Sequence, residues 1–187
     1  MISDPRWPAD PSTWSELVRH YAEPHRHYHT LDHVRAVVEA LPAEASPALI
    51  LAAWYHDVIY DPRASDNEQR SADFLRLAMP DSPHLESACR LILLTQTHQA
   101  AEDDHEGHLL LDADLAILAS TPALYDAYAE AIRREYDWVP EEAYRSGRAA
   151  ILERFLARPC IYHTARMAPH EPKARDNLRR EIERLRG

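Results

Sequence analysis

The sequence predicts an all-α fold of about eight or nine helices, and three observations support this prediction. Proline is frequent, with 14 residues, whereas glycine is rare, with 3. A hydroxyl residue precedes proline at Ser46-Pro47, Ser82-Pro83 and Thr121-Pro122, a pattern typical of the first turn of a helix. Alternating strand patterns and glycine-containing hairpin turns are hard to find.

In the first half of the chain, start signals and apolar spacing predict five helices. Thr13 with Glu16, and Ser65 with Glu68, have the spacing of a capping box. Apolar residues recur at helical spacing between Leu31 and Leu41. The expected helices lie at 13–22, 30–41, 47–58, 66–79 and 83–98.

Four more helices are expected in the second half, after a polar and acidic loop over 99–107. An apolar segment begins at Leu109, and apolar residues recur at helical spacing from Leu124 to Tyr136. Pro140 precedes two glutamates whose charge suits a helix N-terminus. The last helix alternates arginines with acids, as a solvated face does. These helices are expected at 109–119, 122–137, 141–157 and 172–186.

Length and charge limit the function classes. The 187 residues suit a single domain over 1–187, since domains usually hold about 100–200 residues. The formal net charge of −10 disfavours binding to nucleic acid by bulk charge and binding to anionic membranes. The longest apolar runs are too short for a membrane span, and no signal segment opens the chain, so a cytoplasmic protein is expected.

Histidines and aspartates at three places in the chain suggest a metal site. His29 and His33 are four residues apart at the start of a helix, and His56-Asp57 ends an apolar helix. Asp112 and Asp114 interrupt another apolar segment, where a carboxylate needs a positive partner. One divalent cation would satisfy all three, and the N/O ligand set suits Mn, Fe, Co, Ni or Zn, with Mg binding more weakly. The alternative is three unrelated events: a capping histidine, a histidine on a helix dipole and a solvated aspartate pair.

These residues, in this order, resemble a known family. Tyr28-His29-Thr30-Leu31-Asp32-His33-Val34, His56-Asp57 and Asp112-Ala113-Asp114 are similar to the H…HD…D signature of the HD superfamily of metal-dependent phosphohydrolases. The motifs lie within residues 26–114. Asp66-Asn67-Glu68 and Tyr144-Arg145-Ser146-Gly147-Arg148 also resemble a small bacterial branch of predicted HD-domain proteins. The resemblance implies the helical HD bundle and one or two bound metal ions.

The resemblance also implies a role for each residue. His33, His56, Asp57 and Asp114 would bind metal, with Asp112 supporting them or the fold. His29 would be the proton donor, as in the cyclic-nucleotide phosphodiesterases of the superfamily, unless it is itself a ligand. The implied reaction is hydrolysis of a small, nucleotide-like phosphoester by a metal-activated water.

Three further residues are weaker candidates. Glu68 is a candidate base or supporting carboxylate, if it is not simply part of a capping box. Arg26 and Asn67 are candidate contacts for the phosphorylated substrate, because arginine is well shaped for bidentate phosphate binding.

Two other functions remain open at this point. His98 is a candidate additional ligand, and if His84 and His98 both bound metal the pattern would approach that of the di-iron HD oxygenases. The chain could also be a non-catalytic module that binds a nucleotide or a partner protein around a structural metal. A homodimer through apolar side chains of the late helices is compatible with the sequence.

Overall fold

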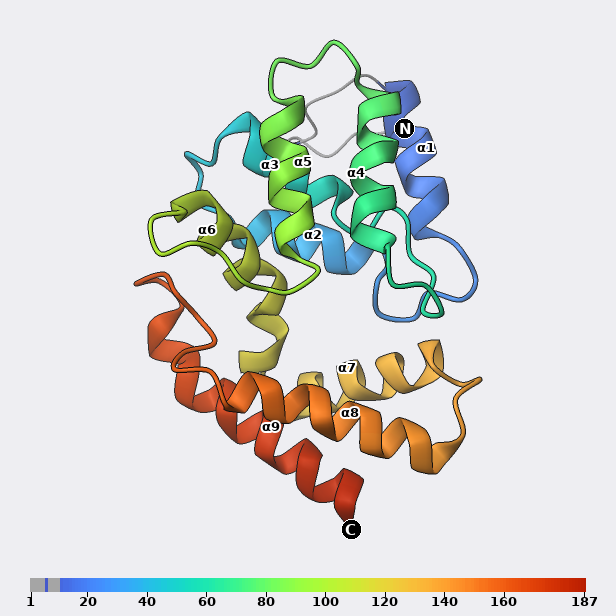
Figure 1. Ribbon diagram of the computed structural model, residues 1–187, viewed down its shortest axis with the longest axis vertical. Helices are drawn as coiled ribbons and strands as arrows, with labels where there is room; N and C mark the ends of the chain where they lie inside the picture. The colour runs from blue at the N-terminus through green and yellow to red at the C-terminus, as the bar shows by residue number, and fades with distance from the viewer. Residues whose placement is uncertain (1–5, 7–10) are drawn as a thin grey trace. The chain divides into compact units, whose positions relative to one another are not determined.

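The computed structural model describes residue 6 and residues 11–187, and this part of the chain is entirely helical apart from its loops (Figure 1). The predicted all-α fold is confirmed. The α-helices of the described part are α1 (Pro11–Tyr21), α2 (Leu31–Ala40), α3 (Pro47–Tyr55), α4 (Asn67–Ala78), α5 (Leu85–Leu94), α6 (His105–Asp114), α7 (Pro122–Glu135), α8 (Glu141–Leu156) and α9 (Glu171–Arg186). Two short 3₁₀ segments, η1 (Leu115–Ala119) and η2 (Ala168–His170), accompany them.

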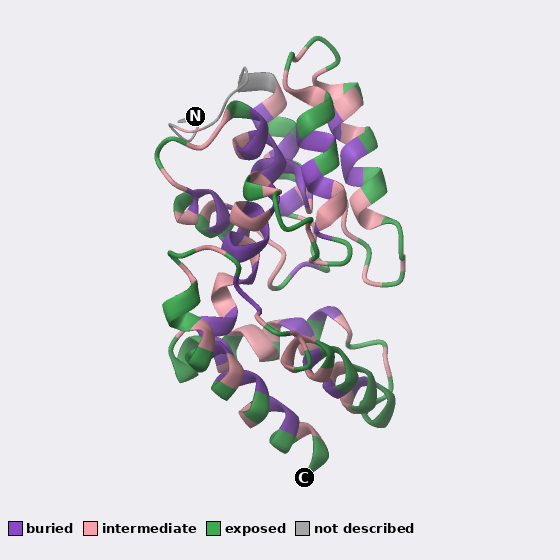
Figure 2. Ribbon diagram, turned by 60° about the vertical axis from the view of Figure 1, so that its left-hand side comes forward, coloured by how far each residue is buried: buried purple, intermediate pink, exposed green. Residues whose placement is uncertain are grey.

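Contacts between residues divide the chain into two compact units. The first extends to Ala113 and the second runs from Asp114 to Gly187. Each has its own buried apolar cluster, shown in purple in Figure 2. The expectation of one domain over residues 1–187 stays a prediction.

The first unit is built around α3, which is buried on all sides. Seven of its nine residues, from Ala48 to Tyr55, are buried. It packs against α2, α4 and α5, and Figure 1 shows α2 and α5 beside it. A helix that is apolar on every face belongs in the interior of a protein. Its C-terminal end, where His56 and Asp57 follow, therefore lies inside the unit.

The second unit consists of α7, α8, α9 and the two 3₁₀ segments. Helix α9 packs against α8, α7 and η1. Beside the apolar cluster lies a buried ion pair: Arg148 Nε donates to Glu181 Oε1 at 2.8 Å, and the two side chains are 9% and 5% exposed. Tyr125 donates its hydroxyl to the same carboxylate.

The predicted capping residues have mixed outcomes. Ser46 Oγ accepts the N–H of Leu49 at 3.1 Å and Thr121 Oγ1 accepts that of Leu124 at 3.5 Å, so these two caps are confirmed. Ser82 does not cap α5, because the helix begins only at Leu85.

Both predicted capping boxes are wrong. Helix α1 begins at Pro11, which places Thr13 within the helix. Helix α4 begins at Asn67 with Asp66 at its N-cap position, one residue after Ser65.

Helix α6 begins at His105, inside the segment expected to be a loop. Asp104 supplies the cap, since its Oδ1 accepts the N–H of Gly107 at 2.9 Å. Glycine allows this close approach: a Cβ at Gly107 would lie 2.7 Å from Asp104 Oδ2 and 2.8 Å from Leu94 Cδ1. The sequence did not indicate Asp104 as a capping residue, because the residues around it are also acidic and polar.

Asp104 gives a testable pH dependence of stability. A hydrogen bond from Arg90 holds the pKa of Asp104 below its ordinary range; burial opposes the shift, and the N–H of Gly107 adds to it. A carboxyl whose pKa is lowered by folding stabilises the protein above its unfolded pKa of about 4, and this stabilisation is lost as the pH falls through the folded value. We expect Asp104→Ala to lower the free energy of unfolding by about 1–2 kcal/mol at pH 7, the usual cost of a lost cap.

Urea unfolding at pH 7, 5 and 3 checks this expectation. The difference between wild type and Asp104→Ala should narrow at pH 3. Asp103→Ala removes an exposed neighbouring carboxylate and is the control, expected to unfold like wild type. A difference that stays constant from pH 7 to pH 3 would contradict the role given to the ionised carboxylate.

Among the described residues, no helix combines the length and the apolarity that crossing a membrane requires.

Candidate metal centre

The first unit brings His33, His56 and Asp57 together. His33 lies in the first turn of α2, on the face that also buries Val34 and Val37. His56 is the C-cap residue of α3, and Asp57 follows it. Ligand atoms of the three side chains lie within 4.8 Å of one another, so this group could hold a metal ion.

The reactive atoms of the three side chains converge on one point. His33 Nε2 lies 3.3 Å from His56 Nε2 and 3.5 Å from Asp57 Oδ2, while His56 Nε2 lies 3.1 Å from Asp57 Oδ2. His56 Nδ1 lies 2.9 Å from the carbonyl oxygen of Ala53, which accepts its proton. In the neutral ring this bond leaves the lone pair on Nε2, the state in which histidine binds metal, whereas only the protonated ring can donate from Nε2 to Asp57.

The donor set fits a divalent transition metal. Two imidazole nitrogens and a carboxylate oxygen suit Mn, Fe, Co, Ni or Zn better than the all-oxygen environment that Mg and Ca prefer. The His33 and His56 side chains are 4% and 1% exposed, whereas that of Asp57 is 16% exposed. The centre is therefore held in the interior, with an approach from solvent at Asp57.

The histidines keep Asp57 ionised. Burial alone would raise the pKa of Asp57, but the neighbouring His56, a hydrogen bond with His33 and a further one with His56 together hold it well below its ordinary value. His29 contributes in the same direction. The carboxylate is thus ready to bind a cation.

Arg26 connects the two segments that carry these residues. Its side chain is fully buried, and Nη1 donates to the carbonyl oxygens of His29 and Asp57 at 3.0 and 2.8 Å. Nη2 donates to Val58 O at 2.9 Å and Nε to Glu23 at 3.0 Å. All of these hydrogen bonds are made within the protein. The guanidinium therefore positions the backbone around the site, in place of the predicted contact with substrate.

Asn67 also holds the backbone. Its Oδ1 accepts the N–H of Asp61 at 3.0 Å and its Nδ2 donates to Asp61 O at 2.9 Å. These bonds close the loop that joins the turn of His56 and Asp57 to α4. Nothing in this arrangement directs Asn67 toward a substrate.

His29 lies beside the ligand group and is half-buried. Its ring centre is 5.8 Å from that of His33, with the two rings nearly perpendicular, and 4.3 Å from that of Tyr60. His29 thus lies beside the candidate ligand group, and its role as proton donor or as an additional ligand stays a prediction.

The pKa of Glu68 is affected by the charges of Asp57 and His56 in the candidate centre. Burial raises the pKa of Glu68 against the lowering effect of a backbone hydrogen bond, and the charge of Asp57 raises it further. His98 and His56 act in the opposite direction. Glu68 lies in the first turn of α4 and is half-buried, and its role as a base or supporting carboxylate stays a prediction.

The two remaining candidate histidines are separated by α5. His84 is the N-cap residue of α5, and His98 follows its C-terminal end, where it has a left-handed φ of 49°. The ten helical residues between them span about 15 Å. The two histidines cannot bind the same ion, and His98 lies close enough to Glu68 to lower the pKa of that carboxyl.

The distal aspartates are not part of the described ligand group. Asp112 lies on α6 and is 2% exposed, in agreement with a supporting or structural role. Asp114 is the last residue of α6, is half-buried and begins the second unit. Its assignment as a ligand stays a prediction.

Sequence reasoning missed three residues that support the turn around Asp57. Tyr21 donates its hydroxyl to Trp54 O at 2.8 Å. Ser71 Oγ accepts the N–H of Ile59 at 3.1 Å. Tyr60 packs against His29. No motif spacing identifies residues that act by packing or by single backbone contacts.

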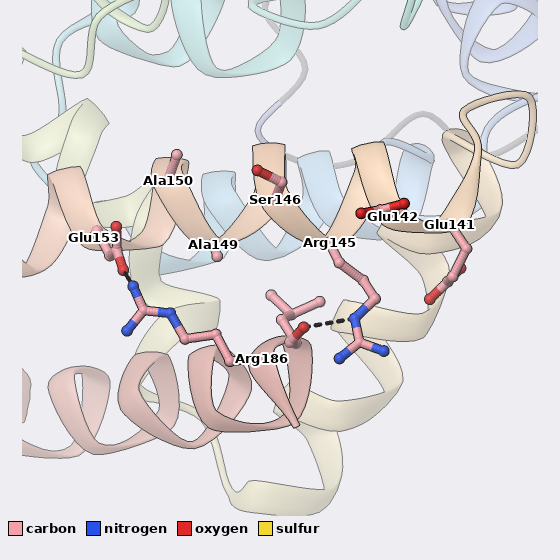
Figure 3. Close-up of a pocket in the computed structure, with 9 residues that line it drawn as sticks. Glu141, Glu142, Arg145, Ser146, Ala149, Ala150, Glu153 and Arg186 are labelled. Atoms are coloured by element: carbon pink, nitrogen blue, oxygen red, sulfur yellow. Dashed lines mark hydrogen bonds and ion pairs between the residues drawn. The ribbon is translucent and has the colours of Figure 1, made fainter.

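A depression in the second unit, between α8 and α9, contains none of the predicted site residues (Figure 3). Its charged side chains are largely paired with the protein itself: Arg186 with Glu153, and Arg145 with the carbonyl oxygen of Leu185. Nothing in this lining indicates a ligand.

No protein-family model, curated protein or solved structure matches the chain.

Proposed function

We propose that the first unit is a metal-dependent hydrolase of small phosphoesters. The observation that carries the proposal is the convergence of two imidazole Nε2 atoms and the Asp57 carboxylate, with the His56 tautomer set by Ala53. The ordered motifs that resemble the HD superfamily support the same reaction class. A bound transition metal would supply an activated water and polarise a phosphoryl oxygen.

The residues around the ligands have complementary roles in this reaction. His29 donates a proton to the departing alkoxide, a role that suits imidazole near neutral pH. Glu68 accepts a proton from the attacking water, since its raised pKa brings it closer to the working pH. Arg26 holds the His29 and Asp57 segments in register without contacting substrate.

The proposal is tested first by metal content and hydrolysis. Elemental analysis of the purified protein should give about one equivalent of Mn, Fe, Co, Ni or Zn. The loaded protein should hydrolyse p-nitrophenyl phosphate or bis(p-nitrophenyl) phosphate and lose this activity on chelation. Two equivalents of iron with oxygen consumption would favour an oxygenase, and full metal without hydrolysis of any phosphoester would favour a binding module.

His29→Ala separates the proton donor from the ligands. We expect the variant to keep its metal and to lose about 10²–10⁴-fold in kcat, the usual contribution of general acid–base catalysis. His27→Ala removes an exposed histidine two residues away and is the matched control, expected to retain both properties. Loss of metal in His29→Ala would instead make His29 a ligand.

A further inference from the structure

We infer that Tyr60 is a positioning residue for the His29 imidazole and acts through ring contact with it. The inference rests on the proposed function, because it gives His29 the role of proton donor. The two rings have centres 4.3 Å apart and planes tilted by 30°, so the imidazole lies partly over the tyrosine face. The neighbouring rings of Tyr28 and His33 meet His29 at 81° and 80°, with centres 5.1 and 5.8 Å away.

The backbone around Tyr60 is fixed on both sides. Its carbonyl oxygen lies 2.8 Å from His25 Nε2. At the preceding residue, Ile59, the N–H and the carbonyl oxygen both bond to the buried hydroxyl of Ser71, at 3.1 and 3.2 Å. Tyr60 is therefore a firm support for the ring that it contacts.

The tyrosine ring is also engaged by Arg26. The guanidinium carbon lies 5.4 Å from the ring centre, within the range of a cation–π contact. Arg26 also donates to the backbone oxygen of His29 at 3.0 Å. One arginine thus fixes the His29 backbone directly and packs on the tyrosine that supports the imidazole.

These contacts favour positioning over substrate binding. A substrate contact would need a ring face open toward the ligands, whereas the Tyr60 ring is engaged by His29 and Arg26. The hydroxyl is not required for ring contact, so phenylalanine should replace tyrosine. A branched aliphatic residue should leave the imidazole without its flat support.

A double-mutant cycle with Mn²⁺-loaded protein and bis(p-nitrophenyl) phosphate tests the inference. We expect Tyr60→Leu to lower kcat about 10–100-fold with KM and metal content unchanged, since small misplacements of a catalytic group have effects of this size. Tyr60→Phe should retain kcat within about threefold. In the His29→Ala background, Tyr60→Leu should have no further effect on kcat.

Several results would overturn the inference. A raised KM with unchanged kcat would make Tyr60 a substrate contact. An equal loss of kcat in the presence and absence of the His29 side chain would show that Tyr60 acts independently of it. Loss of metal in Tyr60→Leu would show that Tyr60 is needed for the metal centre to form, and not only to position His29.

A labelling experiment keeps this inference separate from the proposed function. Carbethoxylation by diethyl pyrocarbonate, followed residue by residue by mass spectrometry, should be faster at His29 in Tyr60→Leu than in wild type or Tyr60→Phe. Exposed His27 is the internal reference, with an unchanged rate. An unchanged rate at His29 overturns the contact, whether or not the protein hydrolyses phosphoesters.

Discussion

Asp57→Ala is expected to abolish stoichiometric metal binding and leave the helices intact. Asp57 is the one carboxylate of the described ligand group, and the two histidines bring no negative charge to offset the cation. Substitutions of residues that only support a metal ligand already cost about 10–100-fold in affinity, so loss of this ligand should cost at least about a hundredfold. His56→Ala should behave in the same way, because its Nε2 is held toward the group by Ala53.

Metal analysis and far-ultraviolet circular dichroism on the same samples distinguish loss of metal from loss of fold. Asp32→Ala is the matched control, since Asp32 is an exposed carboxylate next to His33 on α2. We expect it to bind metal as wild type does. Full metal retention by both Asp57→Ala and His56→Ala would remove the basis of the assigned centre.

Glu181→Ala is expected to destabilise the second unit by about 3–5 kcal/mol, the usual effect of leaving a buried charge without its partner. Arg148 would remain buried with only the hydroxyl of Tyr128, at 3.1 Å, among the side-chain partners described for it. Burial and the charge of Glu181 raise the pKa of Tyr125, which donates its proton to this carboxylate. The substitution therefore removes the acceptor that both groups share.

Urea unfolding of two comparison variants makes this test specific. Asp176→Ala removes an exposed partner of Arg179 and should change stability by less than about 1 kcal/mol. The double replacement Arg148→Met and Glu181→Leu should recover most of the lost stability, because two apolar side chains leave no buried charge. A double variant as unstable as Glu181→Ala would show that packing or the lost acceptor of Tyr125, and not the unpaired charge, is responsible.

The sequence predicted the approximate positions of the described helices, although the start signals at Thr13, Ser65 and Ser82 were wrong. Ser46 and Thr121 cap helices as expected, and the apolar composition of α3 predicts its burial. The start of α6 was missed because the capping Asp104 lies among other acids, and pairs with Arg90 from a different helix.

The candidate site could be predicted only in part. Helical spacing and the cost of burying polar groups indicate His29, His33, His56 and Asp57. The resemblance assigns the ligand role to His33 in place of His29, and the structure brings His33, His56 and Asp57 together. The role of Arg26 could not be predicted, since its partners are backbone oxygens 31 and 32 residues away, which carry no side-chain signature. The contact between Tyr60 and His29 could not be predicted either, because a ring contact depends on how two loops pack.

Burial of α3 on every side has a consequence for how the centre moves. A segment whose amides are enclosed by packed neighbours opens only with most of its unit, so its hydrogen exchange should approach the slow global limit. His56, at the end of that segment, shares its rigidity, whereas His29 lies in the half-buried loop before α2. We therefore expect the His56 end of the candidate centre to keep a constant geometry.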